Sequence, residues 1–459
     1  MFRILEHIAI SLWNRLHGRR KRRATDSTGM LTLGFRVVEG HTTNQRVGLS
    51  QTRRTMHMAV FGKTGSGKSS FLKYACLQDI QAGRGCFFLD LHGDATPFLL
   101  SAIAAEEWRR QEHLSDRVIV ISPSDTEMSV GLNPLETIGS DFVRSAEFSE
   151  VLKQLYNLDY LGARTDELLR NALFVLSANG LTLLELGPVL SDPRFLAKCL
   201  ANTPNAEVRE YFESRYGKAS DPMKATMREP ILNKTSAFTA DPRFRHIVGQ
   251  AQSTFSMTDA MDRGCWVIAH LPKGELGGQA LTLASLLFTV VKNAVFMRKR
   301  KSLFTLYLDE LQNLVSQSSD VETVLSEARK FGVGVVAANQ FLDQYPVSMR
   351  AAILSVASHV SFQLSSVDAA TVSQMLDGGK SLAEQLKNLP QRHFILKSGS
   401  DHWVEGCVPN LEDERRNYTD LLTRSRAIYA RPRAEVERDI ARRHAAHTNK
   451  SNEVLHDWD

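Results

Sequence analysis

Cysteine is scarce in this chain, and long apolar runs do not stand out. The five cysteines are scattered over 459 residues, with no C-x-x-C pair and no spacing that would hold a metal ion. We therefore expect reduced, mostly buried thiols, as in a cytoplasmic protein. We find no window of about 18 or more apolar residues, so the sequence predicts no transmembrane helix. Both absences argue against a disulfide-stapled secreted domain and against a membrane channel.

Acidic residues are scarce in the N-terminal part of the chain only. The net charge is +5, and residues 1–60 hold eleven Lys or Arg against three acidic residues, which is +8 and leaves 5 − 8 = −3 for the rest. The bulk of the chain is therefore not a uniformly basic nucleic-acid binder. A ring of subunits could still bind DNA, because a few basic residues per subunit would be repeated around a pore. The length suggests two or three folding units.

Residues 2–23 combine an apolar stripe with a basic run. Apolar side chains recur at helical spacing from Phe2 to Leu16, and Arg19–Arg23 follows. A secretory signal is disfavoured because its positive charge would precede the apolar run. Two interpretations stay open: an amphipathic helix that lies on the inner membrane or docks on a partner, or a helix that packs on the protein's own body. The first would make a cytoplasmic protein peripheral at the membrane.

Strands and helices alternate over much of the sequence, which predicts an α/β fold with a parallel sheet. This alternation stops over residues 140–258, where the pattern is helical and is interrupted by Asp-Pro pairs. These residues predict an inserted all-α domain. The expected order is an amphipathic basic helix (1–23), a small β segment (24–55), the first part of the α/β domain (56–139), the helical insert (140–258), the second part of the α/β domain (259–410) and a charged, partly helical tail (411–459).

A glycine-rich motif carries the clearest chemistry. The pattern G-x-x-x-x-G-K-[ST] follows the apolar strand 58–61 and opens a helix, which is the context that a phosphate-binding loop requires. Glycines let the backbone fold around phosphates, and the loop N–H groups face the anion. We expect Lys68 to reach the β- and γ-phosphates and Ser69 to bind Mg²⁺. The predicted nucleotide-binding residues are Gly62, Lys63, Thr64, Gly65, Ser66, Gly67, Lys68, Ser69 and Ser70.

Hydrolysis needs a carboxylate far downstream, and Asp309-Glu310 supplies two. They follow the apolar run Leu303–Leu308, so Asp309 can hold Mg²⁺ and Glu310 can polarise the attacking water. A rival carboxylate lies at the end of another apolar strand. We keep Asp90 and His92 there as secondary candidates.

Two further residues are placed near this site by spacing. Gln340 ends the strand at 332–338, so it is expected to sense the γ-phosphate or orient the water. Arg329 lies near the end of the preceding helix, off its apolar stripe, and is expected to be exposed and beside the site. It is either an ordinary solvated arginine or an arginine finger that reaches the nucleotide of a neighbouring subunit.

Four segments taken together resemble the HerA/FtsK-type ring translocases, especially the branch of conjugative coupling proteins of the TraD/TraG type. They are Gly62–Ser69, Asp90–Asp94, Leu308–Asn313 and Arg329–Gln340. The resemblance implies a RecA-like P-loop ATPase with ATP and Mg²⁺, assembled as a hexamer around DNA. It gives Glu310 as base, Gln340 as sensor and Arg329 as the finger acting in trans. A relaxase or a secretion channel is the partner that the resemblance suggests.

Two departures limit this resemblance. Membrane-anchored coupling proteins begin with transmembrane helices, which are not predicted here, and HerA proteins carry a β-barrel for which only about 30 residues are present. We therefore predict a DNA translocase of a soluble coupling type. The alternatives are a protein-secretion or pilus-type ATPase, and an ATP-dependent assembly switch in a defence or partition complex.

Overall fold

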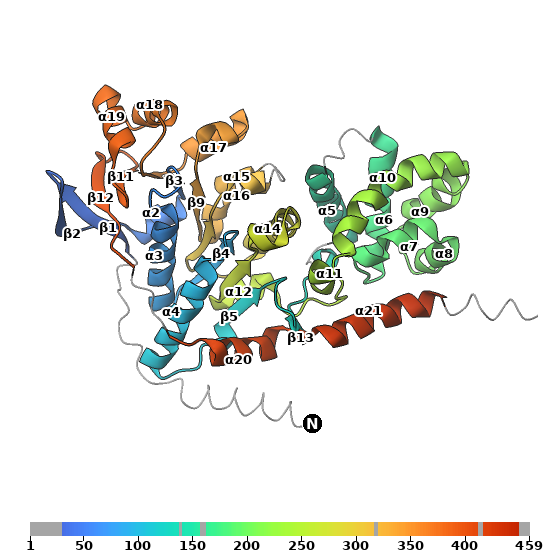
Figure 1. The fold of residues 1–459 in the computed structure, drawn as a ribbon. Helices are drawn as coiled ribbons and strands as arrows, with labels where there is room; N and C mark the ends of the chain where they lie inside the picture. The colour runs from blue at the N-terminus through green and yellow to red at the C-terminus, as the bar shows by residue number, and fades with distance from the viewer. Residues whose placement is uncertain (1–29, 137–139, 157–161, 316–319, 412–415, 449–459) are drawn as a thin grey trace, which may run out of the picture.

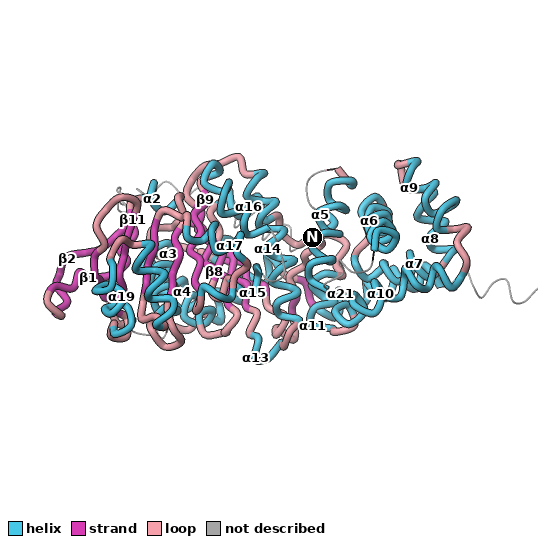
Figure 2. Tube along the Cα trace, turned by 90° about the horizontal axis from the view of Figure 1, so that it is seen from above, coloured by secondary structure: helices cyan, strands magenta, loops and turns pink. Residues whose placement is uncertain are grey.

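A mixed sheet of eleven strands forms the centre of the molecule. The computed structural model describes residues 30–136, 140–156, 162–315, 320–411 and 416–448, so the helix expected over residues 2–23 lies outside the described residues. The strand order is β2-β1-β12-β11-β10-β3-β9-β8-β4-β7-β5. Figures 1 and 2 show helices on both faces of this sheet and a helical lobe beyond one end of it. The predicted α/β fold class is confirmed.

Seven neighbouring strands of the sheet run parallel. They are β10 (Ser358–Ser361), β3 (Met58–Phe61), β9 (Val333–Asn339), β8 (Phe304–Leu308), β4 (Gly85–Asp90), β7 (Trp266–His270) and β5 (Val118–Ile121). Nearly all of their residues are buried, because helices cover both faces and the strand sequences are continuously apolar. Their carboxyl ends share one edge of the sheet, the carboxyl edge, and their amino ends share the opposite amino edge.

Four antiparallel strands extend the sheet beyond β10. They are β11 (His393–Ser398), β12 (Val404–Cys407), β1 (Leu31–Val38) and β2 (His41–Leu49). The small β segment expected near the N-terminus is therefore a hairpin that continues the main sheet. Its link to the sheet is β12, a strand that the sequence did not predict.

Two layers of helices enclose the parallel strands. On one face, α3 (Lys68–Gln81) and α4 (Ala95–Arg110) bury Phe71 and Leu99 against strand residues such as Val60. The other face is covered by α12 (Met257–Arg263), α14 (Gln279–Met297), α16 (Asp320–Glu327) and α17 (Val347–Leu354). Both layers bury apolar side chains, so each face of the sheet has its own core.

Helix α14 corrects one prediction. Among the described residues it is the one helix long and apolar enough to cross a membrane, so the prediction that no such stretch exists is wrong. Its most apolar window is 67% buried within the fold. Leu283, Leu287 and Val291 are fully buried in the core that α14 shares with the sheet. The helix is apolar because it is a core element.

The chain between β6 (Met128–Ser129) and α12 forms the helical lobe, and its described residues contain no strand. Its helices are α5 (Asp141–Tyr156), α6 (Gly162–Ala178), α7 (Leu186–Ser191), α8 (Pro193–Ala201), α9 (Ala206–Glu210), α10 (Asp221–Thr239) and α11 (Pro242–Val248). Asp192 and Asp241 cap two of them, each accepting a hydrogen bond from a backbone N–H two residues on. The proline after each aspartate occupies the first helical position, where it loses no hydrogen bond.

The C-terminal tail first lies against the outer edge of the sheet. Helix α20 (Thr419–Tyr429) packs beside β5, and Ser425 Oγ donates a 2.6 Å hydrogen bond to the backbone oxygen of Val118. The short strand β13 (Arg431–Pro432) then pairs antiparallel with β6. The first half of the tail is therefore part of the sheet lobe.

The second half of the tail, α21 (Arg433–Thr448), lies along the helical lobe (Figure 1). Ile440 is fully buried and packs against Leu184. Arg443 Nε lies 3.2 Å from Oε1 of Glu185, a fully buried carboxylate. The tail thus connects the sheet to the helical lobe through packing and an ion pair.

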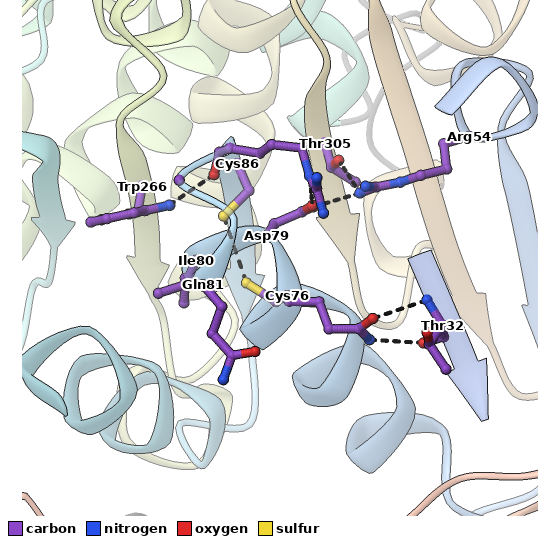
Figure 3. Close-up of polar contacts among 12 residues, drawn as sticks. Thr32, Arg54, Cys76, Asp79, Ile80, Gln81, Cys86, Trp266 and Thr305 are labelled. Carbon is purple, nitrogen blue, oxygen red and sulfur yellow. Dashed lines mark hydrogen bonds and ion pairs between the residues drawn. The ribbon is translucent and has the colours of Figure 1, made fainter. Parts of the chain in front are cut away.

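A buried ion-pair network holds the far end of α3 (Figure 3). Asp79 accepts hydrogen bonds from Arg54 Nη2 at 2.6 Å, Arg84 Nε at 2.7 Å and Tyr307 Oη at 2.7 Å. Burial alone would raise the pKa of Asp79, but the two guanidinium groups outweigh it and lower that pKa. Arg54 Nη2 also donates to Thr305 Oγ1 at 3.0 Å. Because Thr305 and Tyr307 belong to β8, the network fixes α3 relative to that strand.

Candidate nucleotide-binding site

The glycine-rich loop Gly62–Ser69 joins β3 to α3 at the carboxyl edge of the sheet. Gly65 and Gly67 have φ angles of 76° and 116°, in the left-handed region that favours glycine. A Cβ added at Gly67 would lie only 3.0 Å from the Cα atom of Arg392, so a side chain there would crowd that backbone. The strand, tight loop and helix that a phosphate-binding loop requires are therefore all present.

Hydrogen bonds fix the loop from both sides. Lys63 N donates to the backbone oxygen of Gln363 at 2.8 Å, and Ser66 Oγ donates to the backbone oxygen of Lys63 at 2.7 Å. Thr64 Oγ1 donates to Gln340 Oε1 at 3.2 Å. The structure thus brings Gln340, at the end of β9, into contact with the loop.

Lys68 is the first residue of α3 and points back into the loop. Its Nζ donates to the backbone oxygens of Gly62 at 2.5 Å and Lys63 at 2.9 Å. Burial lowers the pKa of Lys68, while the carboxylates of Asp309 and Glu310 oppose that shift. The ammonium group is held inside the loop, where a bound anion would be surrounded by backbone N–H groups, and beside the two predicted acidic residues.

Ser69 and Asp309 come together although β9 separates their strands. Ser69 Oγ donates to Asp309 Oδ2 at 3.3 Å, and Ser70 is half-buried in the same first turn of α3. Burial raises the pKa of Asp309, and the positive charges of His92 and Lys68 oppose that shift. A hydroxyl and a carboxylate are hard oxygen ligands that suit Mg²⁺. No cluster of three or more His, Cys, Asp or Glu suited to a metal occurs among the described residues.

Glu310 is held by three polar side chains. Its Oε2 accepts from Asn313 Nδ2 at 2.7 Å, and its Oε1 lies 3.3 Å from both Gln340 Nε2 and His92 Nε2. The hydrogen bond to His92 lowers the pKa of Glu310 and raises the pKa of His92 to about 9. Glu310 is therefore ionised at neutral pH, as a base must be.

The Asp90 carboxylate accepts hydrogen bonds from the turn that leads into α4. Its two oxygens accept from Gly93 N at 2.7 Å, Thr96 N at 2.8 Å and Thr96 Oγ1 at 2.6 Å, and the residue is 2% exposed. Asp94, at the N-terminus of α4, makes no side-chain capping bond and instead lies 3.0 Å from Lys73 Nζ. Of the two secondary candidates, the structure brings His92 to Glu310 and uses Asp90 to hold the turn.

Arg329 is not beside this site in its own subunit, so that part of the prediction is wrong. It is exposed in the short helix Ala328–Phe331, just before β9 begins. A hydrogen bond shows that this helix lies at the amino edge. Phe304 N, at the start of β8, donates to the backbone oxygen of Gly332, which directly follows the helix, at 3.1 Å. Since β8 and β9 are parallel, the length of both strands separates Arg329 from Glu310.

Two residues near the loop escaped the sequence analysis. Asn313 follows Glu310 by one helical turn, so its spacing could have identified it. Arg392 donates its backbone N–H to the oxygen of Ser66 at 2.8 Å. No local pattern marks Arg392, because only the antiparallel return of β11 brings it to the loop.

Comparisons with known proteins point in one direction. A family model described as the central domain of the helicase HerA matches residues 36–238. The bacterial conjugative coupling protein TrwBdeltaN70 is 18% identical, with a TM-score of 0.62 over 85% of this chain and 96% of that chain. VirB4 of Thermoanaerobacter pseudethanolicus is 14% identical, with a TM-score of 0.56 over 84% of this chain and 97% of that chain. TrwB in complex with ADP and Mg²⁺ gives 18% identity and a TM-score of 0.62 over 85% and 97% of the two chains. No curated protein matches the chain.

These likenesses bear on two predictions. The RecA-like P-loop NTPase fold is confirmed, since the structural match to TrwB spans most of both chains. The resemblance to HerA/FtsK-type ATPases of the coupling-protein branch is confirmed by the HerA model together with the TrwB and VirB4 folds. At identities below 25% the structural matches speak for the fold, and the chemistry rests on the side chains described above.

Proposed function

We propose that the chain is an ATP-hydrolysing DNA translocase that works as a ring of six copies, in conjugation, mobile-element transfer or DNA processing. One observation carries the proposal: the residues suited to nucleotide chemistry gather at the carboxyl edge, while Arg329 is exposed at the amino edge. In a head-to-tail ring two different surfaces of the chain meet, and we propose that the amino edge of one copy faces the carboxyl edge of the next. Each active site is then built from two subunits.

ATP and Mg²⁺ are the cofactors of this reaction. The backbone of residues 62–70 and the ammonium group of Lys68 bind the phosphates. Ser69 and Asp309 would hold a magnesium ion, which would supply positive charge to the phosphates when bound. The complex of TrwB with ADP and Mg²⁺ supports this assignment.

Glu310 is the general base. Its ionised carboxylate accepts a proton from the attacking water, while Asn313 and Gln340 fix its orientation through their hydrogen bonds. Gln340 also contacts Thr64, so it links the water site to the loop around the phosphates. Arg329 of a neighbouring copy supplies positive charge to the transition state.

DNA is the proposed cargo. Support comes from the match to the HerA helicase model and from the fold of TrwB, a conjugative coupling protein. We place the protein in the cytoplasm, with residues 2–23 as a peripheral contact to the inner membrane. A relaxase or a secretion channel would be its partner.

DNA-stimulated ATP turnover tests the proposal. We expect single- or double-stranded DNA to raise the turnover of the purified protein, and negative-stain images with ATP and DNA to show six-fold rings. An ATPase that ignores both kinds of DNA would refute the DNA motor in favour of a protein-secretion motor. Directional stripping in a triplex-displacement assay would eliminate an assembly switch that does not move.

A further inference from the structure

Arg392 lies directly against the glycine-rich loop. Its backbone N–H donates to Ser66, and its Cα and Cγ atoms are 3.0 Å and 3.3 Å from the position that a Cβ on Gly67 would take. The backbone N–H of Val408 donates to the carbonyl oxygen of Arg392 at 2.9 Å. The residue is therefore held on both sides, with its side chain beginning next to the N-terminus of α3.

The backbone at this position does not favour arginine. Its φ angle is 70°, in the left-handed region that glycine and asparagine adopt at lower cost. A conformation of this kind is unfavourable for a non-glycine residue. The hydrogen bonds to Ser66 and from Val408 use only the backbone, so they would be kept by glycine. The arginine side chain must therefore be explained separately.

The guanidinium group of Arg392 has no hydrogen-bond or ion-pair partner in the part of the chain that the structure describes. The residue is half-buried, and its side chain passes Gly67 at the Cγ atom, 3.3 Å from the position of a Cβ there. A guanidinium in such a place suits a phosphate group, which it can bind through two parallel hydrogen bonds. Lys68, which directly follows Gly67 in the sequence, is held inside the loop.

We propose that Arg392 contacts the phosphates of the nucleotide bound in its own subunit and so sets nucleotide affinity. This inference rests on the proposed function, since it requires nucleotide in the loop. It gives the site two arginines with different tasks. Arg392 acts in cis on phosphates that ADP and ATP share, whereas Arg329 acts in trans on the charge that develops during hydrolysis.

Nucleotide affinity of Arg392→Asn tests the proposal, because asparagine tolerates the left-handed backbone and removes the charge. The probe is a fluorescent ADP and a fluorescent non-hydrolysable ATP analogue, with Kd measured for both. We expect roughly tenfold weaker binding of both nucleotides, the loss of one charge-assisted contact. Arg392→Lys should restore part of the affinity. Arg46→Asn, which removes one exposed charge from the β2 hairpin, is the matched control and should bind as the wild type does.

Unchanged affinity in Arg392→Asn would overturn the proposal and leave Arg392 as a backbone support for the loop. Arg392→Gly keeps the test decisive if the asparagine variant does not fold, because glycine relieves the backbone and should still weaken binding. Failure of the wild-type protein to bind either nucleotide would instead refute the proposed function. The two failures are therefore distinguishable.

Discussion

Arg329 and Glu310 lie at opposite ends of two neighbouring parallel strands. Arg329 precedes β9 at the amino edge, and Glu310 follows β8 at the carboxyl edge. Glu310 is also in the left-handed region, with a φ angle of 53°, and is held by Asn313. Neither residue can reach the other within one copy, so any joint role in hydrolysis requires two copies.

Mixing two inactive variants tests this division. We expect Glu310→Gln to lower turnover by roughly 100-fold or more through loss of the base. Arg329→Ala should lower it by roughly 1000-fold through loss of the finger. In an equimolar mixture, about a quarter of the interfaces in a head-to-tail ring pair an intact Glu310 with an intact Arg329. ATP turnover of the mixture should therefore recover to a measurable fraction of the wild-type rate.

The control for mixing is Lys330→Ala, which removes an exposed charge next to Arg329. It should leave turnover near the wild-type value. Mixed rings that stay as inactive as either variant alone would place the action of Arg329 within a single subunit, against the separation seen here.

His57 should make stability depend on pH. It is buried between α2 (Gln51–Thr55) and β3, and its Nδ1 accepts the N–H of Val335 at 3.1 Å. Burial lowers its pKa to about 4 from 6.5, and the charge of Arg329 contributes. As the pH falls below 6.5, His57 is protonated in the unfolded chain but not yet in the folded protein, which favours unfolding. The stability that is present above pH 6.5 is therefore lost progressively as the pH falls to about 4. The loss amounts to about 3 kcal/mol.

His57→Asn is the matched variant, because asparagine tolerates the φ angle of 66° and does not titrate. Denaturant unfolding of both proteins across this pH range should show the wild type losing more stability than the variant. If the plots of stability against pH are parallel for the two proteins, the folded protein takes up a proton on His57 as readily as the unfolded chain does.

Asp79 should be essential for stability. Replacing it with asparagine leaves the Arg54 guanidinium buried and unpaired, so we expect a loss of about 3–5 kcal/mol in the free energy of unfolding. Tyr307→Phe removes one hydrogen bond to the same carboxylate and should cost about 1.5–3 kcal/mol. Chemical denaturation checks both. Equal losses of unfolding free energy in the two variants would contradict the larger contribution that we assign to the ion pair between Asp79 and Arg54.

Local patterns predicted most of the elements and the loop, but not how distant segments meet. The Gly62–Ser69 motif needs only its flanking strand and helix, and both are encoded next to it. Arg329 was misplaced although strand direction alone puts a residue before β9 at the amino edge. Arg392 could not be predicted, since its contact with Ser66 depends on the pairing of β11 with β10. The hydrogen bonds by which Asp90 holds the turn before α4 depend on backbone geometry that its position after an apolar strand does not determine.

The tail offers a last test, because Ile440, like Val436, is buried where α21 packs against the helical lobe. Ile440→Asp removes an apolar side chain from this contact and places a charge there, so docking of α21 should weaken by at least about 2 kcal/mol. Amide exchange in α21 should then speed up by roughly 30-fold. Ala441→Asp adds the same charge on the exposed side of the helix and should leave exchange unchanged. If both variants exchange alike, the other contacts of α21, such as Val436 and the ion pair of Arg443 with Glu185, hold the tail without help from Ile440.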